Sequence, residues 1–164
     1  MKDLIANGVQ FNPGTGKLSE LTEMMVFGAD RVRDDALLLA RVLLCVLFLI
    51  FGWAKLTDFG ATVGYFTHAG VPHPGLATIV AVIMEFFVGV LIVLGVLTRP
   101  LALLLALYTL GTALVGHPYW TMTGPEQLDA EINFYKNISI IGGLILLYVT
   151  GAGRYAVDAK FGFD

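Results

Sequence analysis

The sequence predicts an all-α protein that crosses a lipid bilayer as a polytopic four-helix bundle, with an N-terminal amphipathic interfacial helix. Of its 164 residues, 57% are hydrophobic and only 14% are charged, and the mean hydropathy is +0.78. Soluble domains usually carry about 25% charged residues. The chain also contains four apolar runs that approach the roughly 20 residues a helix needs to cross the hydrocarbon core of a bilayer. Together these observations predict a single membrane domain.

The first 35 residues form a separate N-terminal segment, which we expect on the cytoplasmic side. Asn12-Pro13-Gly14 is a turn signal, and Ser19 is a suitable cap for a helix that continues to about Arg33. Apolar and small residues recur at helical spacing along one face of this segment, and charged residues occupy the other faces. The pattern favours a helix lying flat at the membrane interface, and a docking helix for a partner subunit fits it equally well.

Residues 36–164 form the predicted membrane domain. Its spans cover about residues 36–54, 75–97, 101–116 and 132–148. A tight Thr98-Arg99-Pro100 connection joins the second span to the third. The third run is short and the fourth opens with polar turns, so these two spans have the weakest hydropathy signal.

Positive charges predict which way the bundle faces, because cytoplasmic loops of membrane proteins carry an excess of Lys and Arg. Eight of the ten Lys and Arg residues lie before or at the start of the first span, between the second and third spans, or in the C-terminal tail. Only Lys55 and Lys136 lie on the other side. We therefore expect both termini in the cytoplasm, with residues 56–74 and 117–131 facing outward.

Glu85 is the most informative residue, because it lies within the otherwise uncharged run 75–97. A carboxylate near mid-membrane costs on the order of 2.5–3.5 kcal/mol even on forgiving insertion scales. It persists only if it faces a protein interior and finds a partner there. One interpretation is a hydrogen bond that only packs helices together. The other is a site for a proton, an ion or a polar headgroup, and the residues alone leave both open.

Further polar residues come from the other predicted spans or their outer ends. Lys55 closes the first span, His117 follows the third, and Asn133, Lys136 and Asn137 lie in the opening turns of the fourth. With the predicted topology they all lie at mid-membrane or toward the outer side, which predicts a pocket in the outer half of the bundle. Each also has a plainer interpretation. Lysines anchor helices at the interface, asparagines hydrogen-bond between helices, and a His-Pro pair ends a helix.

Composition argues against several classes of function or site. The formal net charge of −3 gives no indication of nucleic-acid binding. The single Cys45 cannot form an internal disulfide, a CxxC redox pair or a cysteine-ligated cluster. No histidine sits inside a predicted span opposite another, so we expect no bis-histidine haem. The sequence carries no flavin or iron–sulfur signature, and we expect no metal site.

Several short motifs follow one another in the order found in a known family. They are Arg41 at the start of the first span, FGWAKL at 51–56, Glu85 followed by FFVG, GVLTR at 95–99, His117, Asn137 and GAGRYAVD at 151–158. In their order and spacing these motifs resemble the DoxX family, which is related to the small DoxD subunit of thiosulfate:quinone oxidoreductase. The resemblance covers about residues 37–160, so the segment Ser19–Arg33 lies outside the usual family core.

The resemblance implies a four-helix protein of the cell inner membrane, linked to electron transfer. It implies work with quinones or terminal oxidases, or with soluble redox partners that handle sulfur and oxidative stress. By matching positions, the family-like polar residues are Arg41, Lys55, Glu85, His117 and Asn137, and the resemblance assigns them no individual roles. In the C-terminal motif we expect Arg154 and Asp158 to form a cytoplasmic cap or salt bridge.

The first functional hypothesis is the membrane subunit of a quinone-linked oxidoreductase, of the thiosulfate:quinone type by resemblance. Glu85 would be its catalytic acid, and Lys55, His117, Asn137 and Arg41 would bind the headgroup of a quinone substrate. Electrons would come from a redox partner subunit or a soluble oxidoreductase. A first alternative is a non-enzymatic membrane anchor or assembly factor for a redox complex. A second is a small transporter or proton pathway, against which four short, unbroken spans argue.

Overall fold

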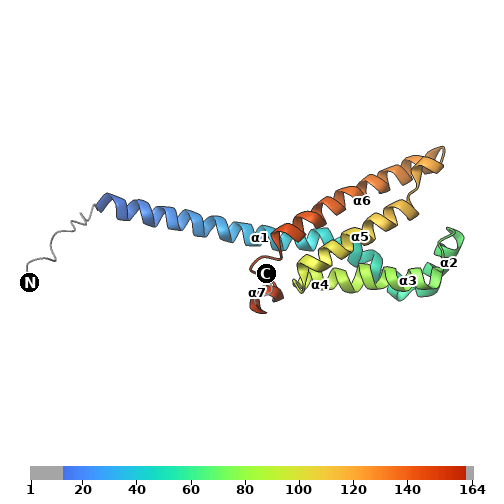
Figure 1. Cartoon of the computed structure of the whole chain (residues 1–164), viewed down its shortest axis with the longest axis horizontal. Helices are drawn as coiled ribbons and strands as arrows, with labels where there is room; N and C mark the ends of the chain where they lie inside the picture. Colours follow the sequence, from blue (N-terminus) through green and yellow to red (C-terminus); the bar gives the residue numbers. More distant parts are fainter. Residues whose placement is uncertain (1–12, 162–164) are drawn as a thin grey trace, which may run out of the picture.

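The computed structural model describes residues 13–161, and side chains are described for residues 32–160 (Figure 1). The described chain is helical and contains no strand. Its elements are α1 (Pro13–Thr57), α2 (Phe59–His68), α3 (Pro74–Val82), the π-helical turn η1 (Ile83–Val88), α4 (Gly89–Leu94), α5 (Thr98–Gly116), the 3-10 turn η2 (Tyr119–Thr121), α6 (Pro125–Thr150) and α7 (Val157–Phe161).

Four helical segments are long and apolar enough to cross a membrane, which confirms the predicted all-α, four-span architecture. They are Val32–Thr57, Pro74–Leu94, Thr98–Thr121 and Pro125–Thr150. The second span consists of α3, η1 and α4, which run on without a break because the backbone keeps helical dihedrals at both junctions. The fourth begins at Pro125 instead of about residue 132. A proline in the first turn and Glu126 beside it favour that earlier start.

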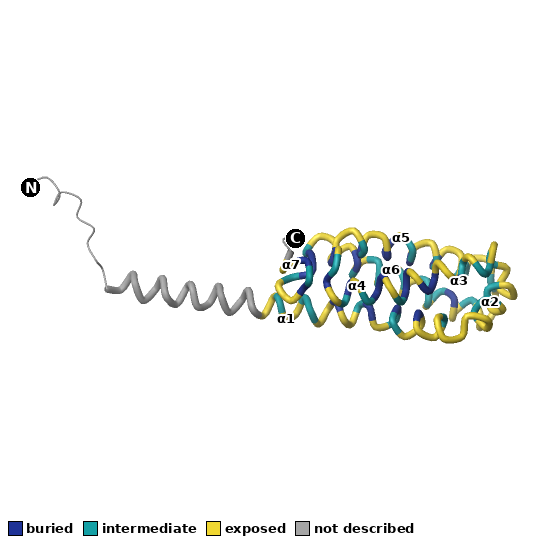
Figure 2. The backbone as a smooth tube through the Cα atoms, turned by 90° about the horizontal axis from the view of Figure 1, so that it is seen from below, coloured by how far each residue is buried: buried dark blue, intermediate teal, exposed yellow. Residues whose placement is uncertain are grey.

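The two ends of the bundle carry different elements (Figure 2). One end, here called the α7 end, holds the α4–α5 turn, the last turn of α6 and α7. The opposite end, here called the α2 end, holds α2, η2 and the first turns of α3 and α6 (Figure 1). Buried residues follow the interior of the bundle, and exposed residues cover its outside (Figure 2).

The core is apolar, and so is most of the outer surface. One cluster of buried residues joins all four spans: Cys45, Phe48, Met84, Val88, Ile92, Ala102, Leu105, Ala106, Leu144 and Leu147. Large apolar residues such as Trp53, Phe87 and Leu146 are at least half exposed. In water such a surface would drive association, but in a bilayer it faces lipid tails that are equally apolar.

Two helical features differ from the sequence-based expectation. The helix expected over Ser19–Arg33 is not a separate element, because α1 continues unbroken to Thr57. No proline interrupts that stretch, and proline is the one residue that reliably breaks a helix. How this segment meets the membrane stays a prediction. In the expected outer loop, α2 forms a further helix, which begins where the Asp58 carboxylate accepts a hydrogen bond from Ala61 N at 3.1 Å.

The C-terminal segment fixes the α4–α5 turn. The turn needs left-handed backbone at Gly95 (φ 74°) and at Leu97 (φ 48°), which is costly for a residue with a branched side chain. The Asp158 carboxylate accepts hydrogen bonds from Leu97 N and Thr98 N, both at 2.8 Å, and thereby caps α5. Asp158 N also donates to Gly95 O at 2.8 Å. Of the two expected alternatives, a cap or a salt bridge, Asp158 forms the cap, and among the described residues no salt bridge joins it to Arg154.

Arg41 is buried at the same α7 end. Its side chain is 1% exposed, and its guanidinium donates to Ala152 O and Tyr155 O, both at 2.7 Å. A Cβ atom at Gly95 would lie 2.8 Å from Arg41 Nη1 and 2.4 Å from Ala156 Cβ. Arg41 thus holds the segment after α6 against the α4–α5 turn.

Asp158→Ala is expected to lower the free energy of unfolding by about 2 kcal/mol, because it leaves the N–H groups of Leu97 and Thr98 without acceptors at a buried helix start. The check is thermal unfolding of the purified protein in detergent. Asp35→Ala is the control, since Asp35 is an exposed carboxylate on α1. An equal melting temperature for Asp158→Ala and wild type would show that the cap contributes nothing.

Candidate functional site

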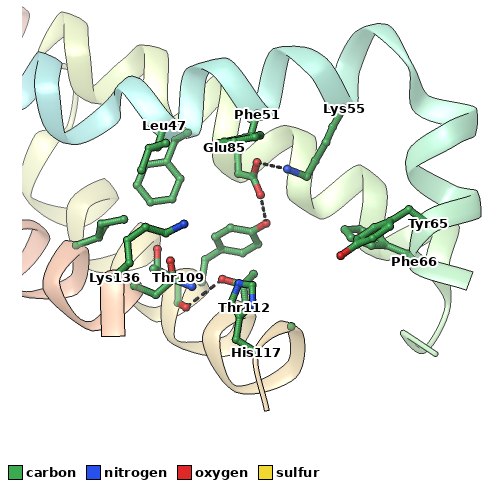
Figure 3. Close-up of a pocket in the computed structure, with 15 residues that line it drawn as sticks. Leu47, Phe51, Lys55, Tyr65, Phe66, Glu85, Thr109, Thr112, His117 and Lys136 are labelled. Atoms are coloured by element: carbon green, nitrogen blue, oxygen red, sulfur yellow. Dashed lines mark hydrogen bonds and ion pairs between the residues drawn. The ribbon is translucent and has the colours of Figure 1, made fainter. Parts of the chain in front are cut away.

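Glu85 lies in the π-helical turn η1, in the middle of the second span. At 1.5 Å per residue it is roughly 16 Å along the helix from Pro74. A π-turn widens the helix by one residue, and such turns are frequent at functional sites. Glu85 as a whole residue is 9% exposed, and its side chain points between helices (Figure 3). The prediction that Glu85 faces the bundle interior is therefore confirmed.

Gly52 lets α1 approach this turn closely. A Cβ atom at Gly52 would lie 2.6 Å from Phe86 N and 2.9 Å from the carbonyl carbon of Glu85. No side chain fits at that distance, so only glycine permits the contact. Lys55 follows Gly52 by three residues and therefore lies on the same face of α1. The FGWAKL segment thus places a lysine directly over the carboxylate.

Both carboxylate oxygens of Glu85 have partners (Figure 3). Lys55 Nζ donates to Oε2 at 2.6 Å, and the Tyr108 hydroxyl donates to Oε1 at 2.7 Å. The side chains of Lys55 and Glu85 are 21% and 12% exposed. Charge-assisted hydrogen bonds of this length are among the strongest in proteins. They offset the cost of holding the carboxylate away from water.

This triad forms one wall of a cavity of about 260 Å³. The cavity lies between α1, η1, α5 and α6, and Tyr65 and Phe66 of α2 also line it (Figure 3). Polar groups from α5 and α6 face it, together with an apolar wall that includes Phe51 and Ile140. The polar lining residues are Tyr65 of α2 together with Lys55, Glu85, Tyr108, Thr109, Thr112, His117, Lys136 and Asn137. A chamber with a mainly apolar wall and several polar groups therefore lies beside the Glu85 carboxylate.

The structure brings four of the five predicted site residues together. Glu85, Lys55, His117 and Asn137 all line the cavity. Arg41 does not, because its guanidinium is bound to backbone carbonyls at the α7 end. Sequence order could not separate these cases, since an arginine near the start of a span can either turn inward or reach the surface. The functional roles of the four residues stay predictions.

Tyr108 is the residue that sequence reasoning missed. It lies in the middle of the third span, where a phenol hydroxyl has no water and needs a protein partner. Tyrosines at span ends are ordinary interface anchors, but a mid-span tyrosine is not. That position was the available signal. Thr112 lies one turn further on, and together they add two hydroxyl groups to the cavity wall.

Lys136 and the histidines occupy different places. Lys136 Nζ donates to Asn133 Oδ1 at 2.6 Å on the exposed side of α6, and its side chain also lines the cavity. His68 ends α2, and His73 begins α3 with left-handed backbone (φ 48°). Within the described part of the chain, no cluster of three or more His, Cys, Asp or Glu could hold a metal ion.

Comparison with known proteins places the chain in a family. The sequence pattern of the DoxX family matches residues 36–118. The inner membrane protein YphA of Escherichia coli K12 is 48% identical over 134 residues, which cover 82% of this chain and 94% of YphA. The inner membrane protein YqjF of the same organism is 37% identical over 128 residues, covering 78% of this chain and 93% of YqjF.

A more distant relative comes from a eukaryote. The ER-derived vesicles protein ERV29 of Saccharomyces cerevisiae is 25% identical over 131 residues, which cover 80% of this chain but 35% of ERV29. No solved structure matches the chain. The family match spans half of the chain, and Arg41, Lys55, Glu85, Tyr108 and His117 lie within the matched range. With its four membrane-spanning helices and its two E. coli inner-membrane relatives, this protein belongs to the DoxX family.

Proposed function

We propose that the cavity beside Glu85 binds the headgroup of a quinone, and that the protein is the membrane subunit of a quinone-linked oxidoreductase. The observation that carries the proposal is the partly buried Lys55–Glu85–Tyr108 triad, which lines a cavity between the helices at the middle of the second span. Intramembrane carboxylates that face a cavity commonly mark pathways for protons or substrates. A quinone dissolved in the bilayer can reach such a site from the side.

The size of the cavity supports a small ligand. Pockets for drug-sized molecules usually measure about 300–1,000 Å³, and this cavity measures about 260 Å³. That volume suits a single substituted ring better than a nucleotide or a flavin. The apolar wall around Phe51 suits the ring faces, and the donors of His117 and Asn137 suit the carbonyl oxygens at its edges.

The chemistry of the triad fits proton delivery. Reduction of a quinone to a quinol takes up two electrons and two protons. The Glu85 carboxylate would take up a proton from water and give it to one quinone oxygen, and the Lys55 ammonium would then again stabilise the carboxylate. The second proton would come from water that reaches the other quinone oxygen. Tyr108 would hold the carboxyl group in place through Oε1. The electrons would come from a partner protein that carries a redox centre.

Binding of a tail-less benzoquinone to the purified protein in lipid nanodiscs tests this function. Wild type is expected to show saturable quenching of its tryptophan fluorescence by the quinone. Tyr108→Phe is expected to bind the quinone about tenfold more weakly, because it loses a hydroxyl group beside the proposed quinone ring. Glu126→Gln is the control, since Glu126 is exposed and lies outside the cavity. Absence of saturable binding by wild type, with a stoichiometric partner protein but no quinone in the purified sample, would favour the anchor role instead.

We further propose an inner-membrane location with both termini in the cytoplasm. The names of the E. coli relatives support the location, and the distribution of Lys and Arg supports the orientation. In that orientation the α2 end of the bundle, and with it the headgroup cavity, faces outward. An outer redox partner would then meet the protein at η2 and the first turn of α6.

Cysteine labelling is expected to verify the orientation. In a variant whose Cys45 is replaced, single cysteines at Thr67 and Thr123 should react with an impermeant maleimide in intact cells. A cysteine at Asp164, which lies outside the described residues, should react only after lysis. Labelling of Asp164→Cys in intact cells, without labelling of the two loop positions, would invert the topology.

A further inference from the structure

A second cavity, of about 490 Å³, lies between α3, the loop before it and the second half of α5. Its walls are hydrocarbon over nearly their whole area, with Leu76, Val80 and Val115 as the large contributors. Each of these three side chains is more than 40% exposed. The cavity is therefore a groove on the side of the bundle, open to the lipid around it.

Small residues create this groove. Gly111 lies on its α5 wall and Ala77 and Ala81 on its α3 wall. A Cβ atom at Gly111 would meet nothing within 4 Å. The two helices thus leave space between them that ordinary side chains would fill, and α3 and α5 touch each other little along it.

The groove adjoins the headgroup cavity. Phe66, Tyr108, Thr112 and Gly116 line both spaces. Tyr108 is a divider between the two spaces, because it lines both and its hydroxyl group binds Glu85. One molecule that passes this divider can therefore place polar atoms beside Glu85 and a hydrocarbon chain between α3 and α5.

We propose that the α3–α5 groove binds the hydrocarbon tail of the same ligand whose headgroup lies beside Glu85. This inference rests on the proposed function and specifies its ligand as a quinone that carries a long apolar tail. The shared wall favours this occupant over the acyl chain of an unconnected phospholipid, because the groove runs up to the edge of the polar cavity. A headgroup cavity of about 260 Å³ has no room for such a tail.

The test compares two benzoquinones with the same ring, one with a decyl tail and one with a methyl group in its place. Gly111→Leu fills the groove without a clash at Cβ. It is expected to weaken binding of the decyl quinone about tenfold, and to leave binding of the tail-less quinone unchanged within about twofold. Gly142→Leu on α6 is the matched control, because a Cβ atom there also meets nothing within 4 Å and lies far from the groove in sequence.

Affinities are measured in nanodiscs and expressed per mole of lipid, so that partitioning of the decyl tail into the bilayer cancels. Val115→Trp narrows the same groove from another position and serves if Gly111→Leu does not fold. Unchanged decyl-quinone binding in a folded groove variant overturns the tail site and leaves the proposed function standing. If native mass spectrometry shows that the groove variant loses only a co-purified phospholipid, the tail site is likewise overturned and the proposed function still stands. Failure of wild type to bind either quinone overturns the proposed function, and the tail site with it.

Discussion

Glu85→Leu is expected to lower the free energy of unfolding by about 3 kcal/mol, because it leaves the Lys55 ammonium partly buried without its counter-charge. The Tyr108 hydroxyl loses its acceptor in the same variant. The measurement is SDS titration of the protein in mixed micelles, followed by circular dichroism. Tail-less quinone binding should disappear as well, since among the described residues Glu85 is the one carboxylate that lines the cavity.

Glu85→Gln separates the two roles of the carboxyl group. A glutamine keeps one oxygen as an acceptor, so the loss of stability should be smaller, about 1–2 kcal/mol. It cannot release a proton to a quinone, so quinol formation with the co-purified redox partner should fall about 100-fold or more. Full turnover in a folded Glu85→Gln protein would leave the carboxylate with a packing role only.

The double variant Lys55→Met/Glu85→Leu provides the control for charge. Replacing a buried ion pair by apolar residues of similar size is often neutral for stability, whereas removing one partner is not. The double variant should therefore be more stable than Glu85→Leu alone, with a coupling free energy of about 1–3 kcal/mol. Additive losses would show that Lys55 and Glu85 do not depend on each other in the folded protein.

Gly52→Ala is expected to have the second large effect, a loss of about 2–3 kcal/mol in stability. Its Cβ atom would lie 2.6 Å from Phe86 N, and the obstructing atoms belong to backbone that cannot rotate away. Either α1 shifts or the π-turn changes, and both movements separate Lys55 from Glu85. Weaker quinone binding should therefore accompany the lower stability, although residue 52 does not line the cavity.

The matched control is Gly142→Ala, in the middle of α6. A Cβ atom there meets nothing within 4 Å, and alanine favours a helix more than glycine does. The control should be as stable as wild type or slightly more so. If Gly52→Ala behaves like Gly142→Ala, the close contact between α1 and η1 is not required for the site.

Much of the architecture could be predicted because the bilayer leaves few alternatives. An apolar run of sufficient length in lipid must form a helix, since every backbone group needs an internal partner. For the same reason Glu85 had to face inward and find Lys55 or another polar group. Hydropathy therefore located the four spans approximately, apart from the earlier start of the fourth, and the cost of burying a charge indicated the candidate site.

The remaining features depend on packing that no short sequence window records. The π-turn at Glu85 differs from an α-helical turn by one hydrogen-bond step, and the backbone of α1 at Gly52 lies against it. The inward turn of Arg41 depends on carbonyl groups 111 and 114 residues later in the chain. The mid-span position of Tyr108 indicates that its hydroxyl group needs a partner, but that this partner is Glu85 depends on how α5 packs beside η1.

The partnership of Arg41 with the segment after α6 has a consequence for biogenesis. During synthesis the first span enters the membrane long before Ala152 and Tyr155 leave the ribosome. Throughout that interval the guanidinium must be solvated by water or lipid phosphate, which ties the first span to the membrane surface at that end. Arg41 can become a buried residue that is hydrogen-bonded to backbone carbonyls only after α6 has inserted. The hydrogen bonds of Arg41 to Ala152 and Tyr155 thus form last, at the α7 end, which is the end of the bundle away from the headgroup cavity.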